Sequence, residues 1–184
     1  LQIKGSEGAK YKSFDTREEA ERALATSPYA YIGKNAKKKS EKVSSETLPA
    51  CVIDNSLAVD AACSGNPGPM EYRGVHIASR QEVFHFGPTK GTNNIGEFLA
   101  IVHGLALLKQ KEFDMPIYSD SVNAISWVRQ KKCKTKLPRT AETEELFKLI
   151  ERAEKWLREN TYTTRILKWE TKEWGEIPAD FGRK

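Results

Sequence analysis

The stretch LAVDAACSGNPGP (57–69) decides the fold. Residues 57–63 form an almost continuous apolar run, which predicts a buried strand, and SGNPGP (64–69) is made of turn formers. Asp60 stands in the middle of that strand. A buried carboxylate costs several kcal/mol unless a cation, strong donors or a proton accompanies it. The neighbours of Asp60 on its own face, Ala58 and Ala62, are small and leave room for such a partner.

The segments after this strand predict an α/β fold. Further strands are expected at 71–79, 81–87, 114–120 and 161–169, with a turn near Ser79-Arg80 and a loop at 88–94. Helices are expected at 95–110, 121–130 and about 140–159. The expected order is β-β-β-α-β-α-α-β-α, in which the last helix falls in the closing segment EIPADFGRK (176–184). Three antiparallel strands followed by αβ units predict a five-stranded mixed sheet, with parallel additions and helices on both faces.

The chain divides into three parts by composition. Residues 1–33 resemble part of a small module, with a strand at 9–14 and a helix whose Thr16 and Glu19 have capping-box spacing. Residues 34–50 are rich in Lys and Ser and predict a basic, flexible linker, either a solvated tether or a direct phosphate contact. Residues 51–184 have the composition of a packed domain.

Composition restricts the class of protein and its partners. No apolar run approaches the roughly 20 residues that cross a bilayer, and the N-terminus lacks the apolar core of a signal peptide. The chain begins with Leu1, as expected if it starts inside a longer protein. Three cysteines without C-x-x-C spacing argue against disulfides and zinc, and they suit a reducing cytoplasm. We expect a cytoplasmic protein and, separately, a monomer. A net charge of +5 and a pI near 9.0 favour a polyanionic partner.

Three further acids are candidates to join Asp60, although each has a structural explanation. Glu97 in the expected first helical turn compensates the helix dipole, Asp120 caps the next helix, and Asp180 caps a last turn. However, adjacent strands place Asp60 and Asp120 together, and the helix can lay Glu97 over them. Oxygen donors without clustered His or Cys suit Mg²⁺ or Mn²⁺. Two such ions activate a water and stabilise the leaving oxygen in phosphodiester hydrolysis.

Four motifs closely resemble the type 1 ribonuclease H family: VDAACSGNPGP (59–69), GTNNIGEFLAIVHGL (91–105), IYSDS (117–121) and GEIPADFGRK (175–184). They occur in the family's order at compatible spacing, and each holds one acid. The resemblance spans about residues 52–184 and implies the ribonuclease H-like fold. It also implies that Asp60, Glu97, Asp120 and Asp180 are the catalytic, metal-binding acids, with two Mg²⁺ ions as cofactor and Mn²⁺ as an alternative.

The same resemblance implies substrate contacts. Glu97 would reach a ribose 2′-OH, the group that distinguishes RNA from DNA. Gly65 and Gly68 would permit close approach of the loop to the substrate. The basic segment Lys131, Lys132, Lys134 and Lys136 lies where some relatives carry a substrate-gripping protrusion, although a solvated loop is the alternative. The implied contacts to the two strands are Asn66, Thr92, Asn93 and Asn94.

The N-terminal part resembles the second half of the small hybrid-binding module found in many cellular relatives and in a plant-virus inclusion protein. The matching stretch is GAKYKSFDTREEA (8–20), and Tyr11, Lys12 and Phe14 would face nucleic acid. The catalytic part departs from the family in one loop. Many relatives carry a histidine before the last Asp, whereas ETKEWGE (170–176) has none, and Glu173 or Glu176 is a candidate for an outer role there.

The resemblance predicts an endonuclease that cuts the RNA strand of RNA–DNA hybrids by a two-metal mechanism and leaves 3′-hydroxyl and 5′-phosphate ends. The alternatives are a non-catalytic hybrid-binding protein and a nuclease of the same fold with another nucleic-acid preference. No membrane and no protein partner are indicated. His103 is expected to be a core residue rather than a metal ligand, Trp156 and Trp169 are expected in the core, and Trp174 either lines the site or packs.

Overall fold

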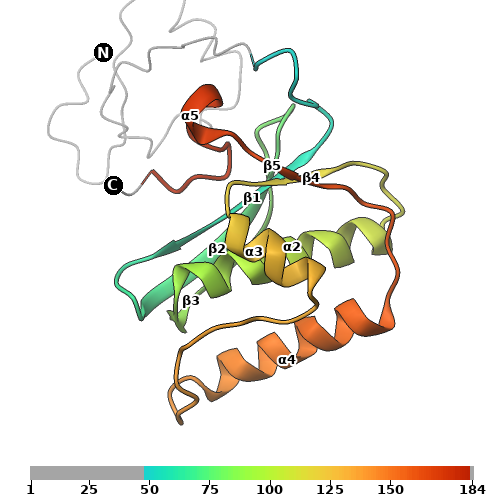
Figure 1. The fold of residues 1–184 in the computed structure, drawn as a ribbon. Helices are drawn as coiled ribbons and strands as arrows, with labels where there is room; N and C mark the ends of the chain where they lie inside the picture. The colour runs from blue at the N-terminus through green and yellow to red at the C-terminus, as the bar shows by residue number, and fades with distance from the viewer. Residues whose placement is uncertain (1–47, 183–184) are drawn as a thin grey trace, which may run out of the picture. The chain divides into compact units, whose positions relative to one another are not determined.

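The computed structural model describes residues 48–182, which are built around one five-stranded sheet (Figure 1). The strand order is β3-β2-β1-β4-β5. β1 pairs antiparallel with β2, and β2 pairs antiparallel with β3, whereas β1–β4 and β4–β5 are parallel. The predicted mixed sheet is therefore confirmed. The strands are β1 Leu57–Cys63, β2 Gly68–His76, β3 Glu82–Gly91, β4 Ile117–Ser119 and β5 Ile166–Lys168.

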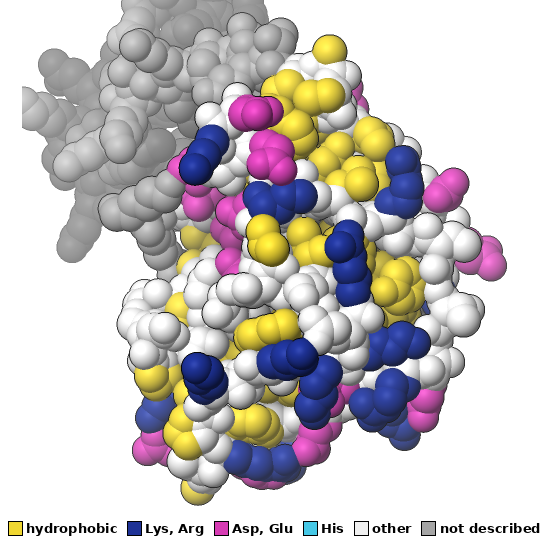
Figure 2. All heavy atoms as spheres, viewed as in Figure 1, with side chains coloured by type: hydrophobic (Ala, Val, Ile, Leu, Met, Phe, Trp, Pro, Cys, Tyr) yellow, Lys and Arg dark blue, Asp and Glu magenta, His cyan; other side chains and the backbone are white. Residues whose placement is uncertain are grey.

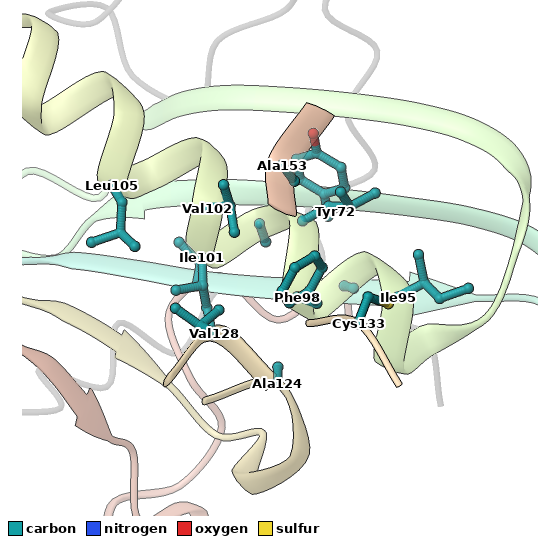
Figure 3. Packing of buried hydrophobic residues seen from close by; sticks show 14 of the residues in the cluster. Tyr72, Ile95, Phe98, Ile101, Val102, Leu105, Ala124, Val128, Cys133 and Ala153 are labelled. Atoms are coloured by element: carbon teal, nitrogen blue, oxygen red, sulfur yellow. The ribbon is translucent and has the colours of Figure 1, made fainter. Parts of the chain in front are cut away.

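Three helices cover one face of this sheet: α2 Asn93–Gln110, α3 Val122–Arg129 and α4 Glu144–Glu159. Alternate residues of β1 and β2 point to them, so Leu57, Val59 and Met70 join the larger hydrophobic core. α2 is the central helix, and Figure 3 shows Phe98 and Ile101 of α2 near Ala124 and Val128 of α3. This core fixes the distance between α2 and the strands.

Gly96 brings the start of α2 close to the sheet. A Cβ atom at this position would lie 2.7 Å from Ala61 Cβ and 2.7 Å from Met70 Sδ, closer than real Cβ contacts allow. Only glycine permits the helix to pack at this separation. The next residue, Glu97, is therefore held beside β1.

The opposite face is covered mainly by irregular segments. The one-turn helix α5 (Thr171–Trp174) and residues 177–179 pack there with the segment that precedes β1. Trp169 is fully buried on this face, and its ring meets Tyr118 and Trp174 edge to face. Helices thus lie on both faces, as predicted, but α2, α3 and α4 share one face while the other has a single helical turn (Figure 1).

The element order agrees with the prediction, whereas several boundaries were wrong. β2 begins within the expected turn, and β3 extends through residues 88–91, expected as a loop, because Gly68 to Met70 pair with Thr89 to Gly91. The strands expected at 114–120 and 161–169 shrink to three residues each. The last helix is α5, inside the segment expected to be a loop. Pairing partners distant in sequence set these limits.

Within residues 48–182, no helix is both long and apolar enough to span a bilayer. The proposed N-terminal module (1–33), with Tyr11, Lys12 and Phe14, lies outside the described residues, as does nearly all of the proposed linker (34–50). Those boundaries stay predictions.

Candidate active site

Three acidic side chains from three different elements meet at one end of the sheet. One carboxylate oxygen from each of Asp60, Glu97 and Asp120 can be chosen so that all lie within 4.8 Å of one another. Asp60 comes from β1, Glu97 from α2, and Asp120 directly follows β4. Because β1 and β4 are parallel neighbours, their chain directions bring Asp60 and Asp120 to the same end. The predicted meeting of these three acids is confirmed as a geometric fact.

Asp60 is the most strongly perturbed of the three. Only 8% of the surface of Asp60 is exposed to solvent. Burial, followed by the charge of Asp120, raises the pKa of Asp60 from 3.8 to about 8. The protein alone therefore supplies too little positive charge to keep the Asp60 carboxylate ionised at neutral pH. A bound cation would supply it.

Glu97 lies two residues deeper in its helix than predicted. α2 begins at Asn93, so Glu97 is beyond its first turn, and compensation of the helix dipole does not explain it. Burial raises the pKa of Glu97 to about 7, against a hydrogen bond from Ser121 that lowers it. Asn93 Nδ2 donates to Glu97 Oε1 at 2.8 Å and orients the carboxylate.

Asp120 is not the helix cap that was one explanation for it. The Ser121 side chain caps α3 by accepting the Ala124 N–H at 3.2 Å. The Asp120 carboxylate is thereby left to face the other acids. Burial raises the pKa of Asp120, while Lys168 opposes the shift, and Glu176 and Asp180 add to it.

Asp180 stands apart from the close group but faces the same space. It lines a cavity of about 320 Å³ together with residues 60–64, Asn93 and Phe181. Its charge contributes to the raised pKa of both Asp60 and Asp120. Its own Oδ2 accepts the Gly182 N–H at 2.8 Å, a local turn of the kind predicted as its structural explanation. Asp180 is thus a neighbour of the three acids on a segment without regular structure.

The residues predicted to contact substrate occupy different settings. Asn66 and Asn94 are exposed. Thr92 caps α2, because its side chain accepts the Ile95 N–H at 3.4 Å. Asn93 lines the cavity and binds Glu97, so it orients an acid whether or not it contacts substrate. Gly65 has φ +113, so the loop beside the site needs glycine there.

The basic segment between α3 and α4 is exposed but anchored. Lys131, Lys132, Lys134 and Lys136 are all exposed. Glu154 of α4 is buried, and it accepts hydrogen bonds from Lys132 Nζ at 2.9 Å and Cys133 N at 3.0 Å. Figure 2 shows Lys and Arg side chains gathered over the region of α3, α4 and their connection. This basic surface is therefore fixed to the core and open to solvent.

Sequence reasoning missed several residues that organise the site, among them Arg73 and Ser121. Arg73 on β2 lies directly opposite Asp60 on β1 in the strand register. Its guanidinium donates to the backbone oxygens of Ala179 and Asp180. The signal for Arg73 was weaker than that for Asp60, because the strand of Arg73 also carries Glu71 and His76. The signal for Ser121 was its position before α3, but Asp120 competed for the same role.

The remaining predicted side chains behave as core residues. His103 stacks on Phe84 with ring centroids 4.0 Å apart, and burial lowers the pKa of its imidazole. Trp169 is buried and Trp156 packs against the larger core, as predicted. Trp174 packs against Trp169, which is the second of its two predicted settings.

The amino-acid sequence matches two known family models. The sequence model described as RNase H matches residues 54–169, more than half of the chain. The chain belongs to the ribonuclease H family. A second model, described as Ribonuclease H1 N-terminal domain, matches residues 1–24, which agrees with the resemblance given for the N-terminal stretch.

Individual relatives cover parts of this ribonuclease H family chain. It is 37% identical over 92 residues to a ribonuclease H from Desulforamulus reducens, covering 42% of this chain and 57% of the relative. Against a ribonuclease H from Sulfurovum sp., identity is 39% over 85 residues, covering 41% and 56%. The chain thus spans about half the length of the curated relatives it matches. The solved RNase H1 from Halobacterium salinarum is 21% identical, with a TM-score of 0.43, over 67% of this chain and 91% of that protein.

Proposed function

We propose that this chain is an endonuclease that hydrolyses the RNA strand of RNA–DNA hybrids with divalent metal ions, leaving 3′-hydroxyl and 5′-phosphate ends. The observation that carries the proposal is the convergence of Asp60, Glu97 and Asp120, whose carboxylate oxygens approach within 4.8 Å. They stand in the motifs at which the family resemblance implies the reacting acids. Asp180, on the rim of the same cavity, is the proposed fourth acid.

The donor set suits hard divalent cations. The ligand atoms of the close group are carboxylate oxygens, which Mg²⁺ and Mn²⁺ prefer. Burial and mutual repulsion raise the pKa values of Asp60 to about 8 and Glu97 to about 7, so the protein leaves negative charge uncompensated here. A cation bound among these oxygens would offset that repulsion and displace protons from the carboxyl groups. Asp60, Glu97, Asp120 and Asp180 would hold two such ions.

The chain's own residues divide the work. Asp60 lies in the middle of β1, and the charges of Glu97, Asp120 and Asp180 all act on it, so it would be a ligand of the bound ions. Asn93 keeps the Glu97 carboxylate turned into the site, and from there Glu97 can also accept a hydrogen bond from a ribose 2′-OH. Ser121 caps α3, so that Asp120 is available to hold an ion beside the attacking water. When bound, the ions lower the pKa of that water and stabilise charge on the leaving oxygen.

The surface supports a nucleic-acid substrate. Lys131, Lys134 and Lys136 are exposed, and Lys132 is anchored by Glu154 with its side chain 64% exposed. Clustered lysines neutralise backbone phosphates without reading sequence. Discrimination of a hybrid from other duplexes would then come from the 2′-OH at the site and from duplex shape. Asn66, Asn93 and Asn94 are the proposed contacts to the two strands, with Thr92 near a phosphate.

The direct test is cleavage of strand-labelled substrates. The protein is incubated with hybrid, double-stranded RNA and double-stranded DNA, with Mg²⁺, Mn²⁺ or EDTA. We expect metal-dependent cutting of the RNA strand of the hybrid alone, and 5′-phosphate ends by mass spectrometry. Asp60→Asn is expected to abolish cutting, whereas the exposed Asp114→Asn is a matched control that should not change it.

Other outcomes would replace the proposal. Tight hybrid binding without any cutting would make the chain a non-catalytic hybrid-binding protein. Preferred cutting of double-stranded RNA would make it a nuclease of the same fold with another preference. Equal loss in the Asp60 and Asp114 variants would show that charge, rather than the acid site, controls activity.

A further inference from the structure

Arg73 lies on the same face of the sheet as Asp60. It pairs in register with Asp60 across β1 and β2, and residues directly opposite each other in antiparallel strands share a face. Its side chain is 26% exposed. A partly buried cation on a sheet is costly unless its donors are satisfied, so its partners indicate its purpose.

The guanidinium of Arg73 grips three consecutive residues of the C-terminal segment. Nε donates to Ala179 O at 2.8 Å, and Nη2 donates to Asp180 O at 2.5 Å. Cζ lies 4.6 Å from the centre of the Phe181 ring. These contacts bracket Asp180. They fasten a segment without regular structure to the middle of the sheet.

The remaining Arg73 contact is weaker. Nη1 lies 3.4 Å from Glu82 Oε2, and the Glu82 side chain is 45% exposed. Exposed ion pairs of this kind contribute little to stability. The planar guanidinium, by contrast, can donate to two carbonyls and stack on a ring at once, which an ammonium cannot. The geometry therefore favours a role toward the tail rather than toward Glu82.

We propose that Arg73 is a positioning residue that sets the place of the Asp180 carboxylate opposite Asp60. It holds the backbone on both sides of the Asp180 Cα, and Asp180 lines the same cavity as Asp60. This inference rests on the proposed function, because Asp180 matters there only as a metal-binding acid. The role of Arg73 is exerted through Asp180 and not through contact with substrate.

The first experiment measures the tail in metal-free protein by hydrogen exchange. The reporters are the Asp180 amide, which donates to Ile177 O at 2.8 Å, and the Gly182 amide, which donates to Asp180 Oδ2. Arg73→Gln is expected to speed exchange of both by about tenfold while β1 amides are unchanged. Glu82→Gln, which leaves the tail contacts intact, should exchange as the unaltered protein does. Unchanged tail exchange in Arg73→Gln would overturn the proposal.

The second experiment asks whether Arg73 acts through Asp180. Mn²⁺ binding is measured by calorimetry, and hybrid cleavage is measured across metal concentrations. Arg73→Gln should weaken Mn²⁺ binding and lower kcat by about tenfold with little change in KM, and Arg73→Lys should recover part of this. In the Asp180→Asn background the same substitution should add less than about twofold, as expected for residues that act as a unit.

These outcomes separate the two proposals. If the unaltered protein cuts hybrid but Arg73→Gln and Asp180→Asn combine additively, the positioning role is wrong and the nuclease function stands. If the unaltered protein cuts no hybrid, the proposed function fails, while the exchange and Mn²⁺ measurements still test Arg73. A loss of β1 protection in Arg73→Gln would mean a general structural role and would also overturn the inference.

Discussion

Three of the four acids stand on the regular framework, whereas the fourth stands on a tail. Asp60, Glu97 and Asp120 belong to, or directly follow, elements whose positions the buried core determines. Asp180 follows a segment attached through Ile177, Ala179 and the contacts of Arg73. The first region is placed by many apolar contacts, whereas the second is placed by two buried apolar side chains and the polar contacts of Arg73. Three acids of such a site are held by the core, whereas a substitution in the tail can displace the fourth without disturbing the others.

The largest expected effect tests this difference directly. Asp60→Asn should lower kcat on hybrid by at least about 10³-fold, because the central charge of the ion site is lost. Asp180→Asn should lower it by about 10- to 100-fold, because the close group of three acids remains. Single-turnover rates at saturating Mg²⁺ give both values. Equal losses would mean that the tail acid is as central as the framework acids.

The next largest loss of activity is expected from a substitution in the framework beside the site. Gly96→Ala adds a Cβ that would lie 2.7 Å from Ala61 Cβ, so α2 must shift and carry Glu97 with it. We expect about 100-fold lower kcat and a free energy of unfolding about 1–3 kcal/mol lower. Gly104→Ala on the same helix meets only flexible side-chain ends at 3.0 and 3.1 Å, and is the control. If both variants lose activity equally, close packing at Gly96 does not place Glu97.

The pH dependence of stability should distinguish the two regions without any substrate. The folded-state pKa of Asp60 is raised to about 8 and that of Glu97 to about 7. The metal-free native state therefore binds more protons than the unfolded state, and stability should fall as pH rises from about 4 to 8.

Asp60→Asn should remove the larger part of this loss. In urea unfolding with EDTA, we expect it to stabilise the protein by on the order of 3 kcal/mol at pH 8 and by almost nothing at pH 4. Asp180→Asn is the matched variant in the tail. It should increase the free energy of unfolding by less, because it weakens the hydrogen bond that the Gly182 N–H donates to residue 180. A gain for Asp60→Asn that does not grow with pH would contradict the raised pKa.

The smallest effect should come from residues outside both regions. Replacing Lys134 and Lys136 by Ala should weaken hybrid binding a few-fold and reduce the slope of log K against log salt by about 2. Neither lysine contacts the acids, so the ratio of the Asp60→Asn and Asp180→Asn effects should stay the same. Binding measured by fluorescence anisotropy at several salt concentrations tests this. An unchanged slope would identify the segment as a solvated loop.

The framework was largely predictable from sequence, and the tail was not. The charge of Asp60 inside an apolar run and the long apolar segment around Glu97 are local signals, so a buried strand and a buried helix followed from them. The limits of β3 and β5 depend on pairing with distant partners, which local patterns do not contain. The contact between Arg73 and the Asp180 backbone joins residues 107 positions apart, and no spacing rule predicts it.

The Ser121 cap has a practical consequence for Asp120. The hydroxyl of Ser121 accepts one of the unpaired backbone N–H groups at the start of α3. The capping residue and the proposed metal-binding residue are therefore neighbours in the chain. Exchange of Asp120 for Asn should leave the helix intact and the basic surface unaltered. The result would be a folded, inactive protein that still grips its duplex. Immobilised, such a variant would serve as a reagent for capturing RNA–DNA hybrids from a mixture of nucleic acids.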